Sequence, residues 1–514
     1  MKKYLLFLGL ALGGGVLTSC DKFFDVNNDP NNPTTSSPNF LLPGIISQGI
    51  QTQMFTSLTT TYLTQYTVRK SAISSTDQFY LSNANSTNTF NYTYFYSAGN
   101  IPTMNEAAEK EGSPVYIGAG KIIYAMDLAH CTDMLGDIPY TEAFQGGQNY
   151  TPKYDSQESI YAAINQLCDE GIAIMQRPAS ESFRPLYISS PSVSGDILFK
   201  GDRTKWIKFA KGLKARQLNH LSKKSTYNPQ LILQLVSESM SSSADDAQLQ
   251  YETAVAPLTG TTSIFGPTRN NYSASTFSTN IIKYLNGNVA GAAFPGVTDP
   301  RLPIMATTIS TGVDPGVTNT AGNTLNGATD FYSSWYAREL GYFEVLTYHE
   351  LQFIKAEAAF RSGDLNTAFT AYKEGISAHM KKIGVGGTNA NPAVTFPTIT
   401  QAQINDYLAS AAVAQSASQL TLKHIMEQKY IAMFLNPESW SDLRRMDFSP
   451  TIYPNLKYPA GAYSALATKP DPKDRWPRRM LPGATEALYN PQEVAKLGAN
   501  DADYISRPLW WDMP

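Results

Sequence analysis

Apolar residues recur at helical spacing along much of this chain, most clearly over residues 348–380. Two stretches in this segment place apolar side chains three or four positions apart, which is the spacing of one face of an α-helix. Gly363 interrupts the pattern, and Asp364 is suited to cap the helix that follows. The apolar face comprises Leu351, Ile354, Ala358 and Phe360 before the break and Ala368, Tyr372 and Ile376 after it. This segment is therefore predicted to fold as two helices joined by a tight turn.

The same segment resembles a tetratricopeptide hairpin, in which small residues sit where two helices cross and an aromatic residue follows four positions on. The match runs over residues 359–372. One such hairpin cannot bury its apolar face alone, so we expect several stacked pairs. Three looser pairs follow the same pattern: 116–133 with 156–175, 205–221 with 229–240, and 403–412 with 420–435. The prediction is a mainly α fold, with about four helix pairs forming a superhelical scaffold.

Four long stretches lack helical periodicity: 77–100, 256–279, 287–330 and 456–514. Loops of this length in a compact protein are usually either functional or disordered. Their many aromatic residues argue against disorder. We therefore expect them to form a loop-rich, ligand-binding face on the helical scaffold.

The N-terminus carries a leader. Lys2 and Lys3 precede an apolar run over residues 4–12, about half the length that spans a bilayer, so the run indicates a secretory signal. It ends in Leu17-Thr18-Ser19-Cys20, which resembles the lipobox of bacterial lipoproteins and implies cleavage before Cys20 and acylation of that residue. An ordinary signal peptide with a chance cysteine is the alternative.

The organisation that follows has three parts. Residues 1–19 form the signal peptide, 20–43 a lipidated tether rich in Asn, Pro, Thr and Ser, and 44–514 a single body. Cys131 and Cys168 lie in helical, apolar surroundings, so we expect two buried thiols, with a disulfide as the alternative.

Composition narrows the class of partner. The net charge is −3 and only 16% of residues are charged, which argues against a nucleic-acid ligand. The chain has 30 tyrosines, and a tyrosine offers a flat apolar face with a polar tip, which suits the binding of polar, partly flat ligands.

Catalytic motifs are mostly absent. His349-Glu350 begins a zinc-protease pattern, but Phe353 stands where the second histidine is needed. The five histidines show no metal-ligand spacing, and no Gly-x-Ser-x-Gly turn occurs. Two carboxylates arranged for glycoside cleavage are not excluded by sequence. We expect no catalytic residue, metal or cofactor.

Two tryptophans lie in helical segments. Trp206 belongs to an apolar stripe beside Lys205, Lys208, Lys211 and Lys214, which fits either a membrane-facing or acid-binding helix or a core helix with a solvated face. We favour the core helix. Trp440 is expected to be structural, with Asp442 pairing an arginine.

Two aromatic clusters are candidates for ligand contact. Trp335 and Tyr336 lie with Tyr332 after a polar loop, and Arg338 follows them; aromatic residues delivered by a loop onto a rigid scaffold suit a stacking site. Asn323 and Asn326 are nearby polar candidates. The second cluster lies between residues 79 and 96 and includes Tyr92 and Tyr94. Packing of the loops is the alternative role for both clusters.

Several segments together resemble the SusD/RagB nutrient-binding outer-membrane lipoproteins, in order and over nearly the whole chain. They are Cys20-Asp21, Asn28-Asp29-Pro30-Asn31, Leu41-Leu42-Pro43, Gly136-Asp137-Ile138-Pro139-Tyr140, Trp206-Ile207-Lys208-Phe209-Ala210, Asp299-Pro300-Arg301-Leu302, Ala356-Glu357-Ala358, Gln428-Lys429-Tyr430-Ile431-Ala432 and Trp440-Ser441-Asp442-Leu443-Arg444-Arg445. The resemblance implies four tetratricopeptide-like helix pairs, a lipid anchor at the cell surface, and a TonB-dependent SusC-like transporter as partner. It implies binding of an oligosaccharide, or of a peptide in some members, without chemistry.

Two departures weaken inference of the ligand from relatives. Residues 478–482 lack the Tyr-Pro common there, and no tryptophan occurs in residues 88–100. A surface glycan-degrading enzyme and a scaffold without a ligand are the remaining alternatives.

Overall fold

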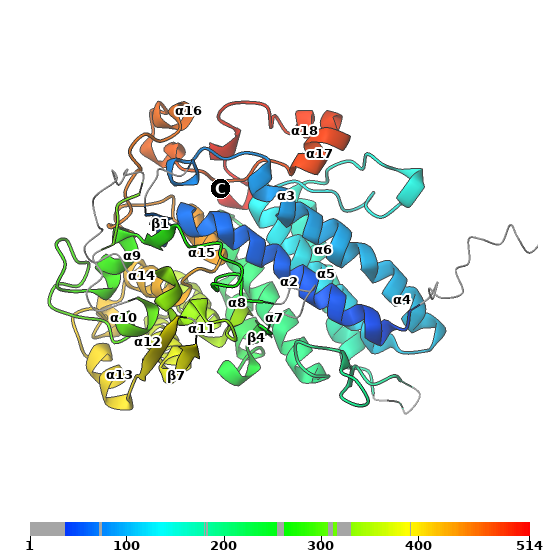
Figure 1. Ribbon diagram of the computed structural model, residues 1–514, viewed down its shortest axis with the longest axis horizontal. Coiled ribbons are helices and arrows are strands. Elements are labelled where there is room, and N and C mark those ends of the chain that lie inside the picture. The colour runs from blue at the N-terminus through cyan, green and yellow to red at the C-terminus, as the bar shows by residue number, and fades with distance from the viewer. Residues whose placement is uncertain are drawn as a thin grey trace, which may run out of the picture.

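The computed structural model describes residues 36–70, 75–178, 180, 183–253, 262–306, 312–315, 330–390 and 392–514. The expected signal peptide, Cys20, most of the tether, and Asn323 and Asn326 lie outside these residues. The described part is mainly helical, with a few two-stranded antiparallel ladders, as predicted (Figure 1). None of its helices is both long and apolar enough to cross a membrane.

The four predicted helix pairs are present. In the first three the two helices pack against each other, and in the fourth both helices pack against the second helix of the third pair. The pairs are α5 (Pro114–Leu135) with α6 (Gln157–Met175), α7 (Arg203–His220) with α8 (Pro229–Ser237), α11 (Tyr348–Arg361) with α12 (Leu365–Ile383), and α13 (Gln401–Leu408) with α14 (Leu422–Ala432). The prediction of tetratricopeptide-like pairs is therefore confirmed.

The α11–α12 hairpin shows why small residues occur in it. Ala368 is fully buried, and a Cβ atom placed on Gly375 would lie 2.9 Å from the ring of Phe353. The Asp364 side chain accepts a hydrogen bond from the backbone N–H of Thr367, which caps α12 as predicted. The two helices thus cross at a distance that larger side chains would prevent.

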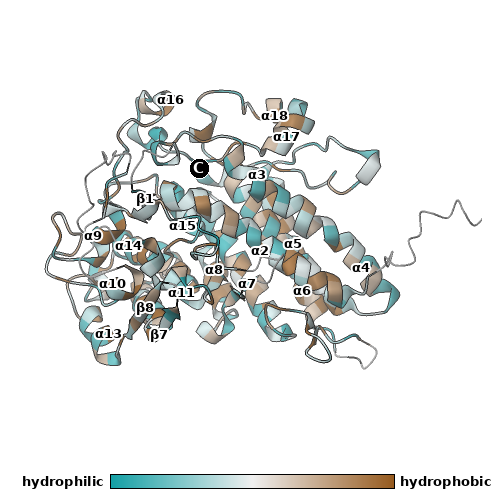
Figure 2. Ribbon diagram, in the orientation of Figure 1, coloured by the Kyte–Doolittle hydropathy of each residue, from teal (hydrophilic) through white to brown (hydrophobic). Residues whose placement is uncertain are grey.

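Helix α2 (Pro38–Leu63) crosses the centre of the molecule and was not predicted (Figure 1). It is buried on nearly all sides, and polar residues are mixed with apolar ones along it (Figure 2). Thr56, for example, donates to the carbonyl of Thr52 at 2.8 Å. Because the helix has no solvated face, it lacks the apolar stripe by which helices are recognised. It also begins inside the expected 20–43 tether, so residues 38–43 are helical.

Residues 77–100, predicted to be irregular, also contain helix. Helix α3 (Ala84–Asn91) leads into the π-helical turn η2 (Tyr92–Ser97), and both pack on α2. Thr89 and Thr56 share a buried hydrogen bond of 2.7 Å between their hydroxyl groups. The prediction was wrong here because α3 is rich in Asn and Thr, which have low intrinsic helix propensity.

The remaining elements are short. The ladders are β1 (Thr67–Arg69) with β5 (Ser275–Phe277), β2 (Tyr187–Ile188) with β3 (Ser194–Gly195), β4 (Ala247–Gln250) with β6 (Tyr342–Leu346), and β7 (Val385–Ala390) with β8 (Ala393–Thr398). The other α-helices are α4 (Ile101–Lys110), α9 (Thr279–Leu285), α10 (Leu302–Met305), α15 (Glu438–Arg445), α16 (Ser464–Ala467), α17 (Ala484–Tyr489) and α18 (Pro491–Lys496). Helices α16, α17 and α18 lie along the upper side in Figure 1, together with α3.

Helix α7 confirms the core-helix interpretation of Trp206, whose ring is fully buried and donates through Nε1 to Asp196 at 2.9 Å. The lysines beside it are paired rather than freely solvated. Lys208 pairs with Asp245 at 2.7 Å, Lys211 with Glu238, and Lys214 with Asp169. They therefore tie α7 to its neighbours.

The opposite side of α7 faces a buried set of charges, which we call the interior ion network. Its members are Asp133, Arg216, His220, Glu350, Glu357, Lys429, Glu438, Asp442 and Arg445. Arg445 contacts the carboxylates of Glu357 at 2.8 Å and Asp442 at 2.6 Å, which confirms the predicted pairing of Asp442 with an arginine. Cys131 and Cys168 are both buried and unpaired, as expected.

Candidate functional site

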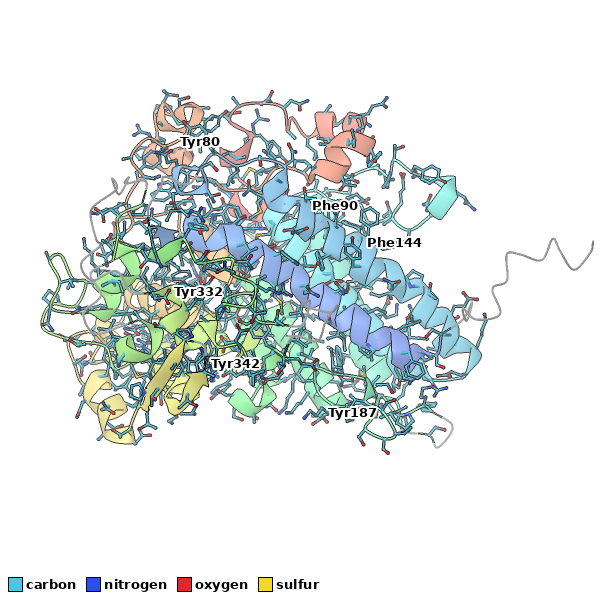
Figure 3. All side chains as sticks on the ribbon, viewed as in Figure 1. Tyr80, Phe90, Phe144, Tyr187, Tyr332 and Tyr342 are labelled. Atoms are coloured by element: carbon cyan, nitrogen blue, oxygen red, sulfur yellow. The ribbon has the colours of Figure 1, made fainter. Side chains whose placement is uncertain are left out.

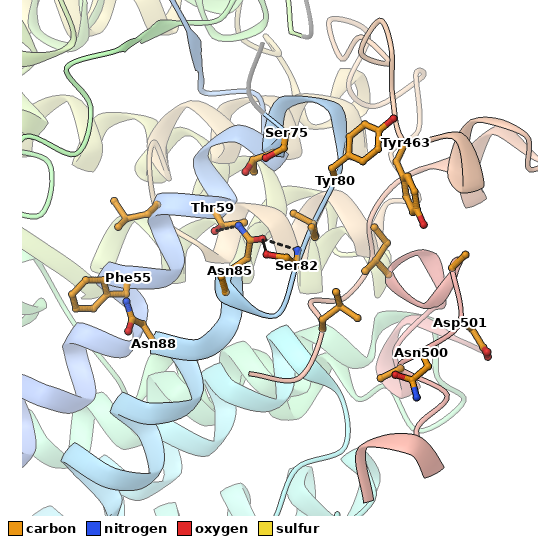
Figure 4. Close-up of a pocket in the computed structure, with 18 residues that line it drawn as sticks. Phe55, Thr59, Ser75, Tyr80, Ser82, Asn85, Asn88, Tyr463, Asn500 and Asp501 are labelled. Atoms are coloured by element: carbon orange, nitrogen blue, oxygen red, sulfur yellow. Dashed lines mark hydrogen bonds between the residues drawn. The ribbon is translucent and has the colours of Figure 1, made fainter. Parts of the chain in front are cut away.

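A cavity lies between α2, α3 and the C-terminal segments, on the upper side of the molecule. It has a volume of about 790 Å³, within the range of small-molecule sites (Figure 4). We call it the Tyr80 pocket. It is lined by Phe55, Leu58, Thr59, Ser75, Thr76, Tyr80, Leu81, Ser82, Ala84, Asn85, Asn88, Tyr463, Leu481, Ala499, Asn500, Asp501, Ala502 and Ile505.

Two walls of the Tyr80 pocket come from opposite parts of the sequence. Helices α2 and α3 supply one wall, and residues 481–505 supply the other. Hydrogen bonds join them: Asn83 Nδ2 donates to the carbonyl of Pro482 at 2.7 Å, and Ser86 Oγ to the carbonyl of Leu481 at 2.5 Å. The backbone N–H of Ala484 donates to Thr87 Oγ1 at 2.9 Å. The pocket is thus a product of the tertiary fold.

Tyr80 and Tyr463 form an aromatic corner at one end of the pocket. Their ring centroids are 5.0 Å apart with the planes tilted by 54°, and 43% of Tyr80 is exposed. The preceding residue, Phe79, is buried against Trp476 and Tyr458, and its φ angle of 66° turns the chain so that Tyr80 faces outward. The N–H of Tyr463 donates to the carbonyl of Gln78 at 2.8 Å, which fixes the two loops together.

The polar groups of the pocket are of two kinds. Asn85 is already bonded: its Oδ1 accepts from the N–H of Ser82 at 2.8 Å, and its Nδ2 donates to Thr59 at 3.3 Å. The exposed side-chain amides of Asn88 and Asn500 have no such partner within the part of the chain that the structure describes. They are therefore available to hydrogen-bond a ligand.

The other end of the pocket is also aromatic. Phe55 lies there beside Asn88 (Figure 4), and its ring centroid is 4.8 Å from that of Tyr92. Tyr92 is in turn 5.0 Å from Tyr96, which is half exposed. The structure therefore brings Tyr92, one of the predicted ligand residues, to the edge of this pocket.

Trp335, Tyr336 and Arg338 come together elsewhere, and they are largely buried. Trp335 is 2% exposed, and the Arg338 guanidinium lies 3.7 Å above its ring. Tyr336 is buried, and its hydroxyl shares a 2.8 Å hydrogen bond with His379 Nε2. In this arrangement the indole presents no open face, so ligand contact here would require Arg338 to move.

Tyr332 and Tyr94 are also buried. The Tyr332 hydroxyl accepts from the N–H of Tyr272 at 3.1 Å, and the Tyr94 hydroxyl donates to the carbonyl of Pro139 at 2.5 Å. Figure 3 shows Tyr332 well apart from Tyr80. The predicted residues thus lie in separate places, and ligand contact at Trp335, Tyr336, Tyr332, Arg338 and Tyr94 stays a prediction.

One cluster has the composition of a metal site. Ligand atoms of Asp133, His220 and Glu438 lie within 4.8 Å of one another, and all three residues are buried. His220 Nδ1 faces Asp133 at 3.3 Å, whereas Nε2 faces Glu438. Burial lowers the pKa of His220, but the Glu438 and Asp133 carboxylates outweigh it and raise that pKa to about 9. The geometry therefore fits a charged histidine clamped between two carboxylates.

Sequence reasoning missed most residues of the Tyr80 pocket. Tyr463, Asn88, Asn500 and Asp501 lie in the stretches identified as long and aromatic-rich, which was the available signal. Their grouping could not be predicted, because residues near 80 and near 500 meet only through the fold. No sequence pattern indicated that Phe55 lines a pocket, because α2 itself was not predicted.

Comparisons with known proteins agree on one family. The model of a SusD-like family, described as "Starch-binding associating with outer membrane", matches residues 30–470. No match was found among curated proteins.

Solved structures similar to this chain show the same fold. A SusD homologue from Parabacteroides distasonis has 20% identity and a TM-score of 0.70, covering 92% of this chain and 96% of its own. A SusD homologue from Bacteroides fragilis has 22% identity and a TM-score of 0.66, covering 91% and 99%. A chitin-binding SusD homologue from Flavobacterium johnsoniae has 20% identity and a TM-score of 0.66, covering 92% and 98%.

Proposed function

Because the chain belongs to the SusD-like family, described as starch-binding and associating with the outer membrane, we propose that it captures a nutrient glycan at the cell surface and passes it to a TonB-dependent SusC-like transporter. An oligosaccharide is the ligand class that the proposal favours. A peptide is the alternative within the same family. The chitin-binding relative from Flavobacterium johnsoniae supports the choice of a glycan.

The observation that carries this proposal is the composition of the Tyr80 pocket. An oligosaccharide presents flat C–H faces flanked by hydroxyl groups, so its binder needs aromatic rings with hydrogen-bonding groups beside them. Tyr80 and Tyr463 supply the rings, and the amides of Asn88 and Asn500 supply donors and acceptors.

Truncation of Tyr80 tests the pocket. We expect Tyr80→Ala to weaken oligosaccharide binding about thirtyfold, because loss of an aromatic anchor commonly costs at least about 2 kcal/mol. Tyr489→Ala is the matched control, since Tyr489 is 68% exposed and does not line the pocket. Titration calorimetry against a panel of oligosaccharides gives both affinities. Equal affinity for the two variants would place the site elsewhere.

The proposal includes a lipid anchor. Residues 1–19 would be removed, Cys20 acylated, and residues 20–37 would tether the body, which begins with α2 at Pro38. Each buried methylene of an acyl chain contributes about 0.8 kcal/mol to membrane binding. We therefore expect Cys20→Ala to release the protein into the soluble fraction. Retention of this variant in cells that lack the transporter would contradict the anchor.

The transporter is the second partner. The helix pairs offer a large packed surface for such a contact, while the loops carry the candidate ligand groups. We expect a gene for a SusC-like barrel beside the gene for this chain. Co-purification of the two products from detergent extracts tests the partnership.

Hydrolysis of the glycan is the rival function, and the Tyr80 pocket offers little for it. Most glycoside hydrolases use a pair of carboxylates beside the scissile bond. Among the described residues that line the pocket, Asp501 is the single carboxylate, and Arg507 contacts it at 2.6 Å. Release of reducing ends from a bound polysaccharide by the purified protein would favour an enzyme.

A further inference from the structure

We infer that the Tyr80 pocket selects uncharged oligosaccharides over acidic ones, an inference that rests on the proposed function and narrows its ligand class. Asp501 is the single charged residue among the described residues that line the pocket. The Asp501 side chain is 57% exposed, and its carboxylate already pairs with Arg507. The pocket therefore presents rings, amides, hydroxyl groups and one negative charge to a ligand.

Two arginines that contact lining residues already have partners in the protein. Arg507 contacts both Asp501 at 2.6 Å and Asp503 at 2.9 Å. Arg269 lies 5.8 Å above the ring of Phe55, and its Nε donates to Thr262 at 3.2 Å. Arg269 is not among the residues that line the pocket. Both guanidinium groups are therefore already engaged by protein groups.

The internal segments that the structure does not describe carry no basic residue. The internal segments outside the described residues are 71–74, 179, 181–182, 254–261, 307–311, 316–329 and 391, and none contains a lysine, arginine or histidine.

An acidic sugar would bind at a cost in such a pocket. A carboxylate or sulfate that leaves water without a cationic partner loses solvation that amides only partly replace. A neutral sugar loses only hydroxyl solvation, which the Asn88 and Asn500 amides can restore. The same absence of cations leaves a carboxylate-bearing peptide without a partner.

The arrangement also suits a chain of sugars rather than one ring. Figure 4 shows Phe55 and Asn88 at one end of the pocket and the Tyr80–Tyr463 corner at the other. Aromatic surfaces at both ends, with polar groups between them, match a ligand that repeats apolar faces and hydroxyl groups along its length. The probe for the experiment is therefore an oligosaccharide of several residues.

The experiment compares one oligosaccharide with its own oxidised form. Purified full-length mature protein is titrated with neutral chito-, malto-, xylo- and manno-oligosaccharides, and with oligogalacturonides and heparin oligosaccharides. Where a neutral ligand with primary hydroxyl groups binds, these groups are oxidised to carboxylates and the titration is repeated. We expect at least tenfold weaker binding of the oxidised form, and further weakening of both forms by Tyr80→Ala.

A charge-introducing variant sharpens the comparison. Asn88→Lys places a cation in the pocket, so we expect it to raise the affinity for the oxidised ligand at least threefold, with the gain lost in high salt. Asn366→Lys is the matched control, because Asn366 is an exposed asparagine on α12, outside the pocket. It should leave both affinities unchanged.

The outcomes distinguish a failure of the proposed selectivity from a failure of the proposed function. Equal or tighter binding of the oxidised ligand by wild-type protein would overturn the selectivity and leave the proposed function standing. Binding of oligogalacturonides or heparin oligosaccharides but of no neutral ligand would do the same. Binding of no oligosaccharide at all would contradict the proposed function, and the selectivity with it.

Discussion

The interior ion network and the Tyr80 pocket are both polar, and both are built from segments far apart in the sequence. In the network each charge has a partner of opposite sign: Arg216 contacts Glu350 at 2.5 Å and Lys429 contacts Asp442 at 2.8 Å. In the pocket the amides of Asn88 and Asn500 have no protein partner among the described residues. Polar groups paired within the protein hold its fold, whereas unpaired groups at the surface are free for a ligand.

The contrast extends to solvent exposure. The side chains of Glu357 and Arg445 are fully buried. Burial raises the pKa of Glu357, but the Arg445 guanidinium outweighs it and holds that pKa well below its usual range. Tyr80, in contrast, keeps 43% of its surface exposed. Changes in the network should therefore act on stability, and changes in the pocket on binding.

The largest effect is expected from Arg445→Met, which leaves the carboxylates of Glu357 and Asp442 buried with fewer partners. Removing one partner of a buried pair commonly costs about 3–5 kcal/mol of folding free energy. Denaturant unfolding measures the loss. Arg361→Met is the matched control, because Arg361 also contacts Glu357 but is partly exposed. Similar losses for both variants would contradict the special role of the network.

Trp335→Ala tests which region this residue belongs to. Its sequence context predicts ligand contact, yet its 2% exposure predicts a packing role. Truncating a buried tryptophan typically costs about 3–5 kcal/mol of stability through the cavity it leaves. We therefore expect a large fall in melting temperature for Trp335→Ala and a small one for Tyr80→Ala. Unchanged stability with weakened binding would instead assign Trp335 to the ligand site.

The pH dependence of stability should reveal His220. A histidine whose pKa rises from 6.5 to about 9 on folding stabilises the folded protein fully below pH 6.5, and this contribution disappears as pH rises through 9. The rise corresponds to about 3 kcal/mol. Unfolding free energies of wild type and His220→Gln should therefore differ most below pH 6.5 and converge toward pH 10. A constant difference would exclude the charged form.

Ala368→Trp should have the smallest effect of the four on stability. Ala368 is fully buried in the α11–α12 hairpin, and overpacking a core position typically costs about 1–3 kcal/mol. Thr370→Trp is the control, because Thr370 is exposed on the same helix. Ligand affinity should be preserved in both, since the hairpin contributes no residue to the Tyr80 pocket. An unchanged melting temperature for Ala368→Trp would mean that the helices are not closely packed there.

The fold could be predicted largely because helix pairs have a local signature. The spacing of Ala368 and Tyr372 and the Gly363-Asp364 turn can be recognised within one short segment. Helix α2 was not predicted because a helix that is buried on nearly all sides has no amphipathic stripe.

The candidate site could be predicted only in part. The stretches that carry Tyr80 and Tyr463 were identified as functional by their length and aromatic content. No local pattern indicates that these two rings lie 5.0 Å apart, or that Trp335 is covered by Arg338. Exposure is decided by tertiary packing, which sequence spacing does not report.

The contact between α3 and the C-terminal segments has a consequence for the export that we propose. The hydrogen bonds that join Asn83, Ser86 and Thr87 to residues 481–484 span 395 to 399 positions of sequence. A chain that crosses a membrane from its N-terminus therefore has no complete pocket until residue 505 has emerged. Under the proposed function, a half-translocated chain would therefore bind no nutrient, and proteolytic removal of the final segment would abolish binding while leaving the helix pairs in place.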